Sequence, residues 1–132
     1  MERSSLDVVR ELFERFNSGD PDSVIELLAE DFVAEVPPSL SAEPDVYEGR
    51  EGALRYLHAF DGLLEDVRFE PLEFHGEGDP VVVEMLLTGR GVTSGIEVTQ
   101  RAVAVVWTEG GSVKRMEPFP DLEAARERLE QG

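Results

Sequence analysis

The chain has 132 residues, of which 41% are hydrophobic, so we expect a single folded domain over residues 1–132 with a buried core. A net charge of −17 without a cluster of Lys or Arg argues against nucleic acid and membrane surfaces as partners, and no run approaches the roughly 20 apolar residues of a membrane span. The absence of cysteine excludes disulfides and thiolate sites, and no apolar leader is visible at the start, so we expect a cytoplasmic protein without a cofactor.

Helical periodicity dominates the first part of the chain. An amphipathic helix begins after Ser4, which can form a capping box with Asp7, and its apolar face consists of Leu6, Val9, Leu12, Phe13 and Phe16. Asp20 and Pro21 have the residue types that begin a second helix, whose buried side consists of Val24, Ile25, Leu27 and Leu28. These are followed by an expected strand over residues 31–36, a loop over 37–44 and a third helix over 49–60.

Strands dominate the second part. They are expected over residues 67–75, 81–90, 96–107 and 112–119, and a last helix capped by Asp121 covers residues 122–132. Pro71 interrupts the first of these strands, which indicates a bulge or an edge strand. Helices followed by a meander predict an α+β fold, in which a cone-shaped, curved antiparallel or mixed sheet is wrapped by three to four helices. Such a sheet encloses a cavity where a small molecule would bind.

Four stretches carry a resemblance to a known family: "FNSGDPDSVIELLAEDFVAEVP", "YEGREGALRYL", "GIEVTQRAVAVVW" and "GGSVKRMEPF". In order and spacing they resemble the nuclear transport factor 2-like superfamily, in its SnoaL-like branch, over nearly the whole chain. The resemblance implies a cystatin-like α+β barrel and a dimer formed through the sheet. It implies no single activity, because the superfamily includes isomerases, dehydratases, polyketide cyclases, epoxide hydrolases and binding proteins.

The resemblance can be tested against the ketosteroid isomerases, which use a helix-one tyrosine, a first-strand aspartate and a protonated aspartic acid. The matching positions here are Leu12, Val36 and Val103, which are all apolar, so that chemistry is absent. The Arg-x-Asp pairing of the epoxide hydrolases has no counterpart in the strands. The acidic base of the SnoaL-type cyclases is not identified in this chain.

Strand register decides which side chains face the cavity. In the strand over 96–107 the bulky alternate residues are expected inside, namely Thr99, Arg101, Val103, Val105 and Trp107. The same reasoning places inside, from the strand over 81–90, Val81, Val83, Met85 and Leu87. In the strand over 112–119 it would place Met116 and Pro118 inside, but alternation there does not decide between the two registers. The outer face is then still apolar, which favours a two-fold homodimer through this face; its residues are Val82, Leu86, Ala102, Ala104 and Val106.

Among the polar candidates, Arg101 is the most informative. A buried arginine needs an anionic partner, which is either the ligand or one of the nearby carboxylates Glu84, Glu97 and Glu117. Tyr56 packs in the core or offers its hydroxyl to a ligand. Asp31 and Glu35, where the second helix gives way to a strand, are interpreted as structural carboxylates and not as an acid/base pair.

The two histidines, His58 and His75, lack the paired spacing of metal ligands, so no metal site is expected. The predicted ligand pocket is therefore mostly apolar and consists of Leu12, Phe16, Val36, Tyr56, Phe60, Val83, Met85, Arg101, Val103, Val105 and Met116.

We expect this pocket to bind a hydrophobic small molecule. Any catalysis would be cyclisation, isomerisation or dehydration around a carbonyl, with Arg101 or Tyr56 polarising its oxygen. One alternative is a module that binds a ligand without chemistry. Another is an interaction domain whose own aromatic side chains fill the cavity.

Overall fold

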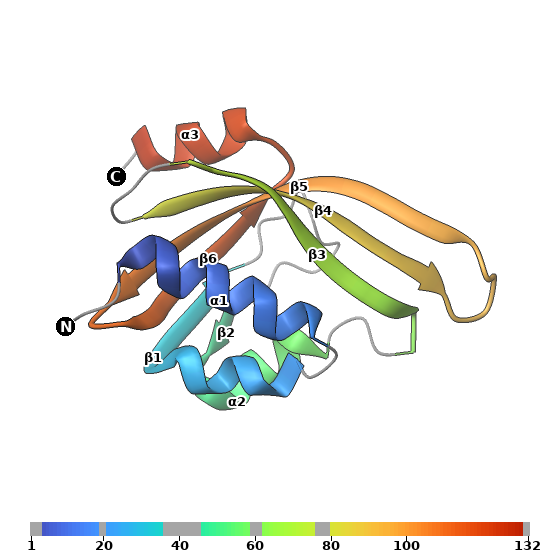
Figure 1. Cartoon of the computed structure of the whole chain (residues 1–132), viewed down its shortest axis with the longest axis horizontal. Coiled ribbons are helices and arrows are strands. Elements are labelled where there is room, and N and C mark those ends of the chain that lie inside the picture. The colour runs from blue at the N-terminus through green and yellow to red at the C-terminus, as the bar shows by residue number, and fades with distance from the viewer. Residues whose placement is uncertain (1–3, 19–20, 36–45, 59–61, 76–79, 131–132) are drawn as a thin grey trace.

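A computed structural model describes residues 4–18, 21–35, 46–58, 62–75 and 80–130, and this part of the chain forms one curved sheet with helices on both faces (Figure 1). In chain order its elements are α1 (Ser5–Asn17), the 3₁₀ helix η1 (Pro21–Leu27), β1 (Leu28–Glu35), β2 (Val46–Glu48), α2 (Gly49–Leu57), β3 (Leu64–His75), β4 (Val81–Gly91), β5 (Glu97–Glu109), β6 (Ser112–Phe119) and α3 (Leu122–Glu130).

The sheet has the strand order β2-β1-β6-β5-β4-β3. The β1–β6 pair is parallel and the other described pairs are antiparallel, so the sheet is mixed. It ends at β2 and β3 and does not close into a barrel. The expected α+β architecture is confirmed, as an open, curved sheet.

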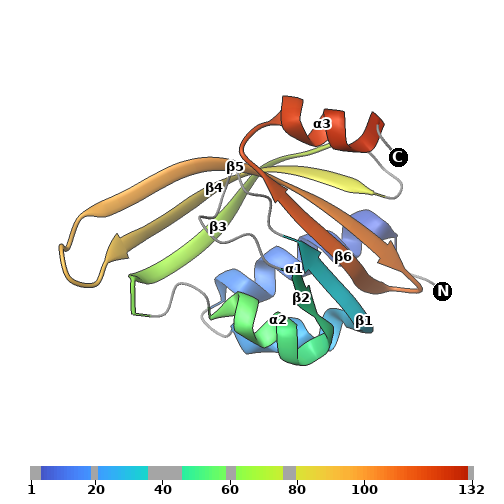
Figure 2. The same cartoon turned by 180° about the vertical axis from the view of Figure 1, so that it is seen from behind.

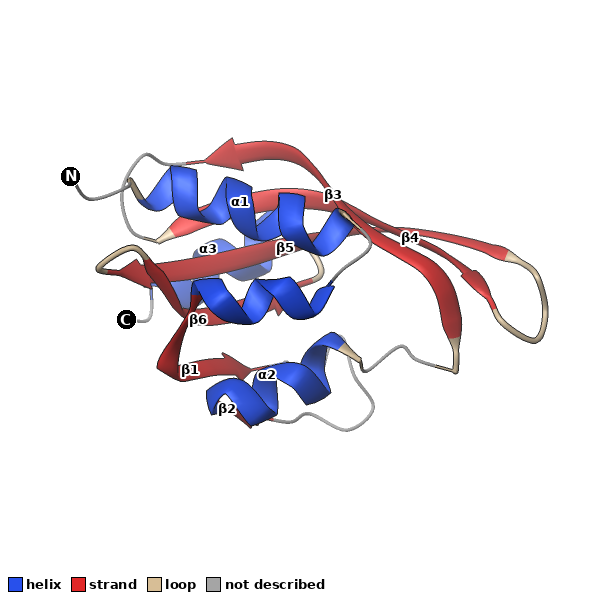
Figure 3. Ribbon diagram, turned by 60° about the horizontal axis from the view of Figure 1, so that its bottom comes forward, coloured by secondary structure: helices blue, strands red, loops and turns tan. Residues whose placement is uncertain are grey.

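The helices divide between the two faces of the sheet. Figure 3 looks onto the face covered by α1, η1 and α2, which we call the inner face, with α3 behind the sheet. α3 lies on the opposite, outer face, and the β4–β5 hairpin projects beyond all the helices (Figures 1 and 2). None of the helices in the described part of the chain is long and apolar enough to span a membrane.

The core has two parts, one on each face. The larger part lies between α1 and the inner face and includes Val8, Leu12, Phe13, Val83, Ala104 and Val106. The smaller part lies beneath α3 and consists of Val103, Val105, Phe119 and Ala125. α3 therefore seals apolar surface that would otherwise face water.

Several local predictions are confirmed. The Ser4 hydroxyl accepts the Asp7 backbone N–H at 3.1 Å and caps α1, and an Asp121 carboxylate oxygen accepts the Ala124 N–H at 2.8 Å and caps α3. These bonds satisfy N–H groups that a helix start leaves without partners. β3 is an edge strand, and its register with β4 shifts directly after Pro71.

The predicted second helix is wrong in type and extent. Residues 21–27 form a 3₁₀ helix, and β1 begins at Leu28, three residues before the expected strand. Leu28 pairs with Val113 of β6, so a contact 85 positions along the sequence sets this boundary. Such a partner is invisible to local periodicity. The short strand β2 was not predicted, and the loop expected over 37–44 lies outside the described residues.

The predicted register is right for β4 and wrong for β5. Val83 of β4 is paired with Ala104 of β5, and paired residues project to the same face. Ala104 therefore lies in the inner core with Val83, whereas Val103 and Val105 lie under α3. The physical reason is that both faces of β5 are covered, one by the inner core under α1 and the other by α3, so both alternate sets of residues are apolar and the bulk of the side chains does not decide the register.

Candidate functional site

A partly open cavity of about 70 Å³ lies between α1 and the inner face of the sheet. Every described residue that lines it is apolar: Leu12, Phe13, Phe16, Val24, Leu28, Phe32, Ala53, Phe69, Met85, Ala104, Val113, Met116 and Pro118. Hence no described residue of this wall can give or take a proton. Its volume is enough for a few water-sized molecules, but the wall offers them no side-chain hydrogen bond.

Small and flexible side chains account for the cavity. Ala53 of α2 and Ala104 of β5 leave space where larger residues would meet the phenyl rings of α1. Met85 and Met116 complete the wall, and methionine is unbranched, so these side chains can adjust to a guest without moving the backbone.

The structure brings together part of the pocket predicted from the sequence. Leu12, Phe16, Met85 and Met116 line the cavity, and Val83 lies next to it in the inner core. Val103 and Val105 are the error, since they lie on the outer face under α3. Val36 and Phe60 lie outside the described residues, as does the side chain of Tyr56.

Arg101 does not belong to the cavity. It pairs with Leu86, projects from the outer face and is exposed, because the register that was expected to bury it is reversed. It forms no ion pair within 4.0 Å with a carboxylate of the described residues, although its charge is a minor cause of the lowered pKa of Glu84, one of the three that were considered. A role for Arg101 in polarising a carbonyl inside the cavity is therefore ruled out by its position.

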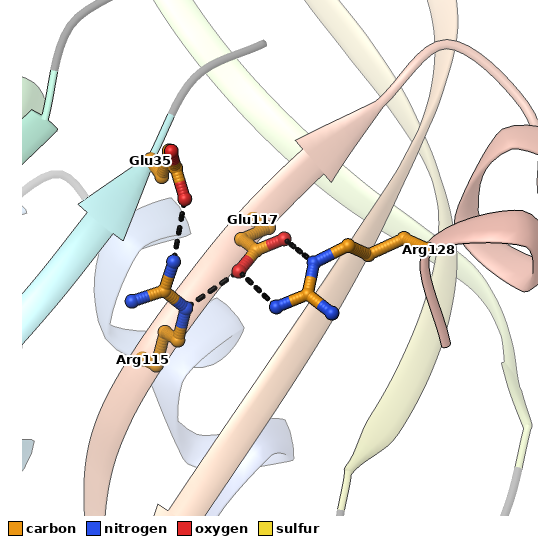
Figure 4. A network of polar contacts seen from close by, with 4 residues as sticks. All are labelled: Glu35, Arg115, Glu117 and Arg128. Atoms are coloured by element: carbon orange, nitrogen blue, oxygen red, sulfur yellow. Dashed lines mark hydrogen bonds and ion pairs between the residues drawn. The ribbon is translucent and has the colours of Figure 1, made fainter. Parts of the chain in front are cut away.

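Glu117 is a buried carboxylate on the outer face. In the sequence analysis it was considered only as a partner for Arg101. Glu117 of β6 is 3% exposed, and its oxygens accept hydrogen bonds from Arg115 at 2.5 Å and from Arg128 of α3 at 2.9 Å (Figure 4). Arg115 also bonds Glu35 of β1. This network ties α3 and β1 to β6 and does not open into the cavity.

Asp31 and Glu35 lie on the surface. Asp31 is within 4.0 Å of Lys114, and Glu35 is the outer carboxylate of the network just described. Neither lines the cavity. These positions agree with the interpretation of Asp31 and Glu35 as structural carboxylates and not as an acid/base pair.

A cluster that sequence reasoning missed occupies the outer face at the β3–β4 edge. Nε2 of His75 lies 2.8 Å from a Glu84 oxygen and 3.8 Å from a Glu73 oxygen. The hydrogen bond with His75 is the main cause that lowers the pKa of Glu84, and burial opposes it. The three side chains have the types and spacing to hold a metal ion. The hydrogen bond between His75 and Glu84 is enough to explain why these side chains lie together. In the sequence, the only sign of the cluster was that Glu73 and His75 alternate on one strand and so project to the same face.

Comparison with known proteins assigns the family. The SnoaL-like domain model matches residues 9–116. The chain belongs to the SnoaL-like domain family. A search of curated proteins found no match.

Solved structures agree on the SnoaL-like, nuclear transport factor 2-like fold. A nuclear transport factor 2-like protein of unknown function from Burkholderia pseudomallei is 25% identical, with a TM-score of 0.76 and 95% of each chain covered. A putative SnoaL-like polyketide cyclase from Jannaschia is 24% identical, with a TM-score of 0.74 over 95% of this chain and 90% of that one. A protein of ketosteroid isomerase-like fold from Catenulispora acidiphila, solved in complex with trimethylamine, is 16% identical, with a TM-score of 0.75 over 88% and 86%. At these identities the likeness establishes the fold.

Proposed function

We propose that this SnoaL-like protein binds a small apolar molecule, or the apolar part of one, in the cavity between α1 and the inner face of the sheet. The observation that carries the proposal is the cavity wall, whose described residues are all apolar and include Met85 and Met116. Burying apolar surface stabilises a complex by roughly 25 cal/mol per Å², without any polar partner.

The wall favours binding over proton-transfer chemistry. Cyclisation, isomerisation or dehydration around a carbonyl needs a group that takes a proton and one that stabilises the oxygen. The described cavity residues supply neither. The trimethylamine complex of a structurally similar protein supports the view that this fold can hold a small molecule.

The test is a benzene titration followed by thermal denaturation, on the wild type and on Ala104→Leu. Benzene at about 100 times its dissociation constant should add roughly 2.7 kcal/mol to the free energy of unfolding of the wild type. Ala104→Leu fills the cavity, so benzene should add much less to the free energy of unfolding of this variant. The matched control is Ala124→Leu, on α3 and packed against the outer core, which should keep the full gain.

Two results would refute the proposal. One is the lack of a shift for the wild type up to the solubility of benzene. The other is an equal shift in Ala104→Leu, because benzene would then bind elsewhere on the chain.

Dimerisation and a cytoplasmic location stay predictions. α3 already covers much of the apolar outer face, and of the residues first assigned to that face Ala102, Ala104 and Val106 lie in the inner core. A second chain would have to use the outer face beyond α3, towards the hairpin end where exposed Leu63, Val92 and Ile96 gather. Sedimentation equilibrium tests this directly: a two-chain mass is expected, and a monomer at tens of micromolar would contradict it.

A further inference from the structure

Three side chains that can ligate a metal ion lie together on the outer face of the sheet, where β3 pairs with β4. Glu73 and Glu84 are opposite each other in the register of the two strands, and His75 follows Glu73 on the same face. Nε2 of His75 and one oxygen of each carboxylate all lie within 4.8 Å of one another. Spacing along the sequence gave no sign of such a ligand set, because Glu84 comes from the neighbouring strand.

The cluster holds two carboxylates and one group that can neutralise them. Nε2 of His75 lies 2.8 Å from a Glu84 oxygen and 3.8 Å from a Glu73 oxygen, and no Lys or Arg in the described part of the chain forms an ion pair with either carboxylate. Like charges directly opposite each other on neighbouring strands repel. The hydrogen bond between His75 and Glu84 relieves this repulsion by at most one charge, whereas a divalent cation would neutralise both carboxylates.

We propose that Glu73, His75 and Glu84 bind one divalent transition-metal ion, such as zinc, on the outer face of the β3–β4 pair. Zinc bonds of about 2.0–2.2 Å place the ligand atoms of a tetrahedral site roughly 3.3–3.6 Å apart. The two distances from Nε2 lie on either side of this range. The Glu73 side chain is 65% exposed, so it can turn towards the ion without displacing a buried neighbour. Three protein ligands leave the fourth position of the ion to water.

The donor set selects the kind of ion. An imidazole nitrogen suits zinc and its neighbours among the transition metals, whereas magnesium and calcium prefer oxygen ligands. The net charge of −17 attracts every divalent cation, so a preference for zinc over magnesium must come from His75. Arg101 opposes the ion, because its charge reaches Glu84 and is a minor cause of the lowered pKa of that carboxyl. Removing the Arg101 charge should therefore strengthen metal binding.

The metal site is separate from the cavity and goes beyond the proposed function. Phe74, which lies between the two β3 ligands in the sequence, projects to the inner face and packs on Phe13 of α1. Val82, which pairs with His75, packs instead on the outer core beneath α3. A bound ion would join the edge strand β3 to β4 from the outer face, without contact with a guest in the cavity.

The experiment is isothermal titration of zinc chloride into the untagged, EDTA-treated protein, with an excess of magnesium chloride in the buffer. The variants are His75→Gln, Glu84→Gln, Glu73→Gln and Arg101→Gln, each checked for its fold by circular dichroism. The matched control is His58→Gln. Nε2 of His58 lies 2.7 Å from an Asp22 oxygen, so it forms the same kind of pair, but no third ligand among the described residues joins it.

We expect the wild type to bind one zinc ion per chain with a micromolar dissociation constant. His75→Gln and Glu84→Gln should each weaken zinc binding by at least about tenfold, because each removes a ligand. Glu73→Gln should weaken it about threefold to tenfold, and this exposed substitution leaves the fold intact. Arg101→Gln should strengthen it about twofold, and His58→Gln should leave it unchanged.

Any of three results would overturn the proposal. The first is a wild type that takes up no zinc, and the second is zinc that magnesium displaces, since both ions would then bind the acidic surface without preference. The third is zinc binding of wild-type strength in His75→Gln or in Glu73→Gln. The benzene titration does not involve these residues, so none of the three results would affect the proposed function of the cavity.

Discussion

Glu117 is the charged residue that the core of the described chain buries, and its two arginine partners explain how it is tolerated. Transferring a lone carboxylate out of water is strongly unfavourable, whereas one held by two guanidinium groups has its oxygens satisfied. Arg128 donates to both oxygens, and its guanidinium also lies 5.6 Å from the centre of the Trp107 ring. The network thus fixes α3 over the outer core at a defined position.

Replacing Arg128 with Met should destabilise the protein by about 1–2 kcal/mol, because Glu117 loses one of its two cationic partners and keeps Arg115. Urea denaturation measures the effect. Arg126→Met on the same helix should stay within about 0.5 kcal/mol. The double variant Glu117→Met/Arg128→Met should be less destabilised than Arg128→Met alone, and a strictly additive loss would contradict the ascribed role of the pair.

Glu84 makes stability depend on pH in a predictable direction. Its pKa lies below the ordinary value of 4.5, mainly because of the hydrogen bond with His75. The folded state therefore binds this proton less readily than the unfolded state. The stabilisation is present above pH 4.5 and is lost as the pH falls through the lowered pKa of the folded state.

In His75→Gln this contribution should be reduced. The variant should be less stable than the wild type above pH 4.5, and the two free energies of unfolding should converge as the pH falls below that value. Denaturation in urea over a pH series measures the difference. His58→Gln, which changes the other histidine, should show no such convergence, and a constant offset for His75→Gln at all pH values would refute the linkage.

At the scale of elements, Asn17 joins the end of α1 to the edge strand β3. Its side-chain amide donates to the Phe69 carbonyl at 2.8 Å and its oxygen accepts the Phe69 N–H at 2.9 Å. The Asn17 side chain thus satisfies the backbone N–H and C=O of Phe69, which would otherwise be unpaired at the edge of the sheet. The ring of Phe69 meanwhile packs on Phe16, with 4.9 Å between the centroids, and both line the cavity.

Asn17→Ala should cost about 2 kcal/mol, for two hydrogen bonds at about 1 kcal/mol each, and should loosen the wall of the cavity. Hydrogen exchange of β3 amides and the unfolding free energy are the readouts. Ser18→Ala removes an exposed helix-end bond to the Arg15 carbonyl and should change stability by less than about 0.5 kcal/mol. Equal effects of the two substitutions would show that the α1–β3 connection carries no particular weight.

Most elements were predictable, because amphipathic periods and caps such as Ser4 and Asp121 are local properties. The faces of β5 were not. Both phases of this strand are apolar, since α1 covers one and α3 the other, so alternation could not choose between Ala104 and Val105. Four of the thirteen described residues of the cavity wall were predicted, namely Leu12, Phe16, Met85 and Met116, and the first three lie on elements whose apolar periodicity or alternation the sequence does specify.

At the scale of the whole molecule, acidic residues outnumber basic ones by 29 to 12. Such an excess repels itself across the folded surface and opposes compaction. Added salt screens this repulsion, and it also weakens exposed ion pairs that contribute little. We expect the screening of the net negative charge to have the larger effect on stability.

Raising sodium chloride from 10 mM to 0.5 M should therefore increase the melting temperature. Differential scanning calorimetry measures it, with an equal osmolarity of sorbitol as the uncharged control. A fall in melting temperature would mean that the ion pairs outweigh the net charge.

The central claim is that the cavity between α1 and the sheet accepts an apolar guest. A crystal structure under xenon pressure tests it most directly, because xenon enters apolar cavities without needing hydrogen bonds. We predict a xenon peak between Phe69, Met85 and Ala104, which vanishes in Ala104→Leu. A wild-type crystal with xenon bound only elsewhere, or with these side chains collapsed onto one another, would contradict the account.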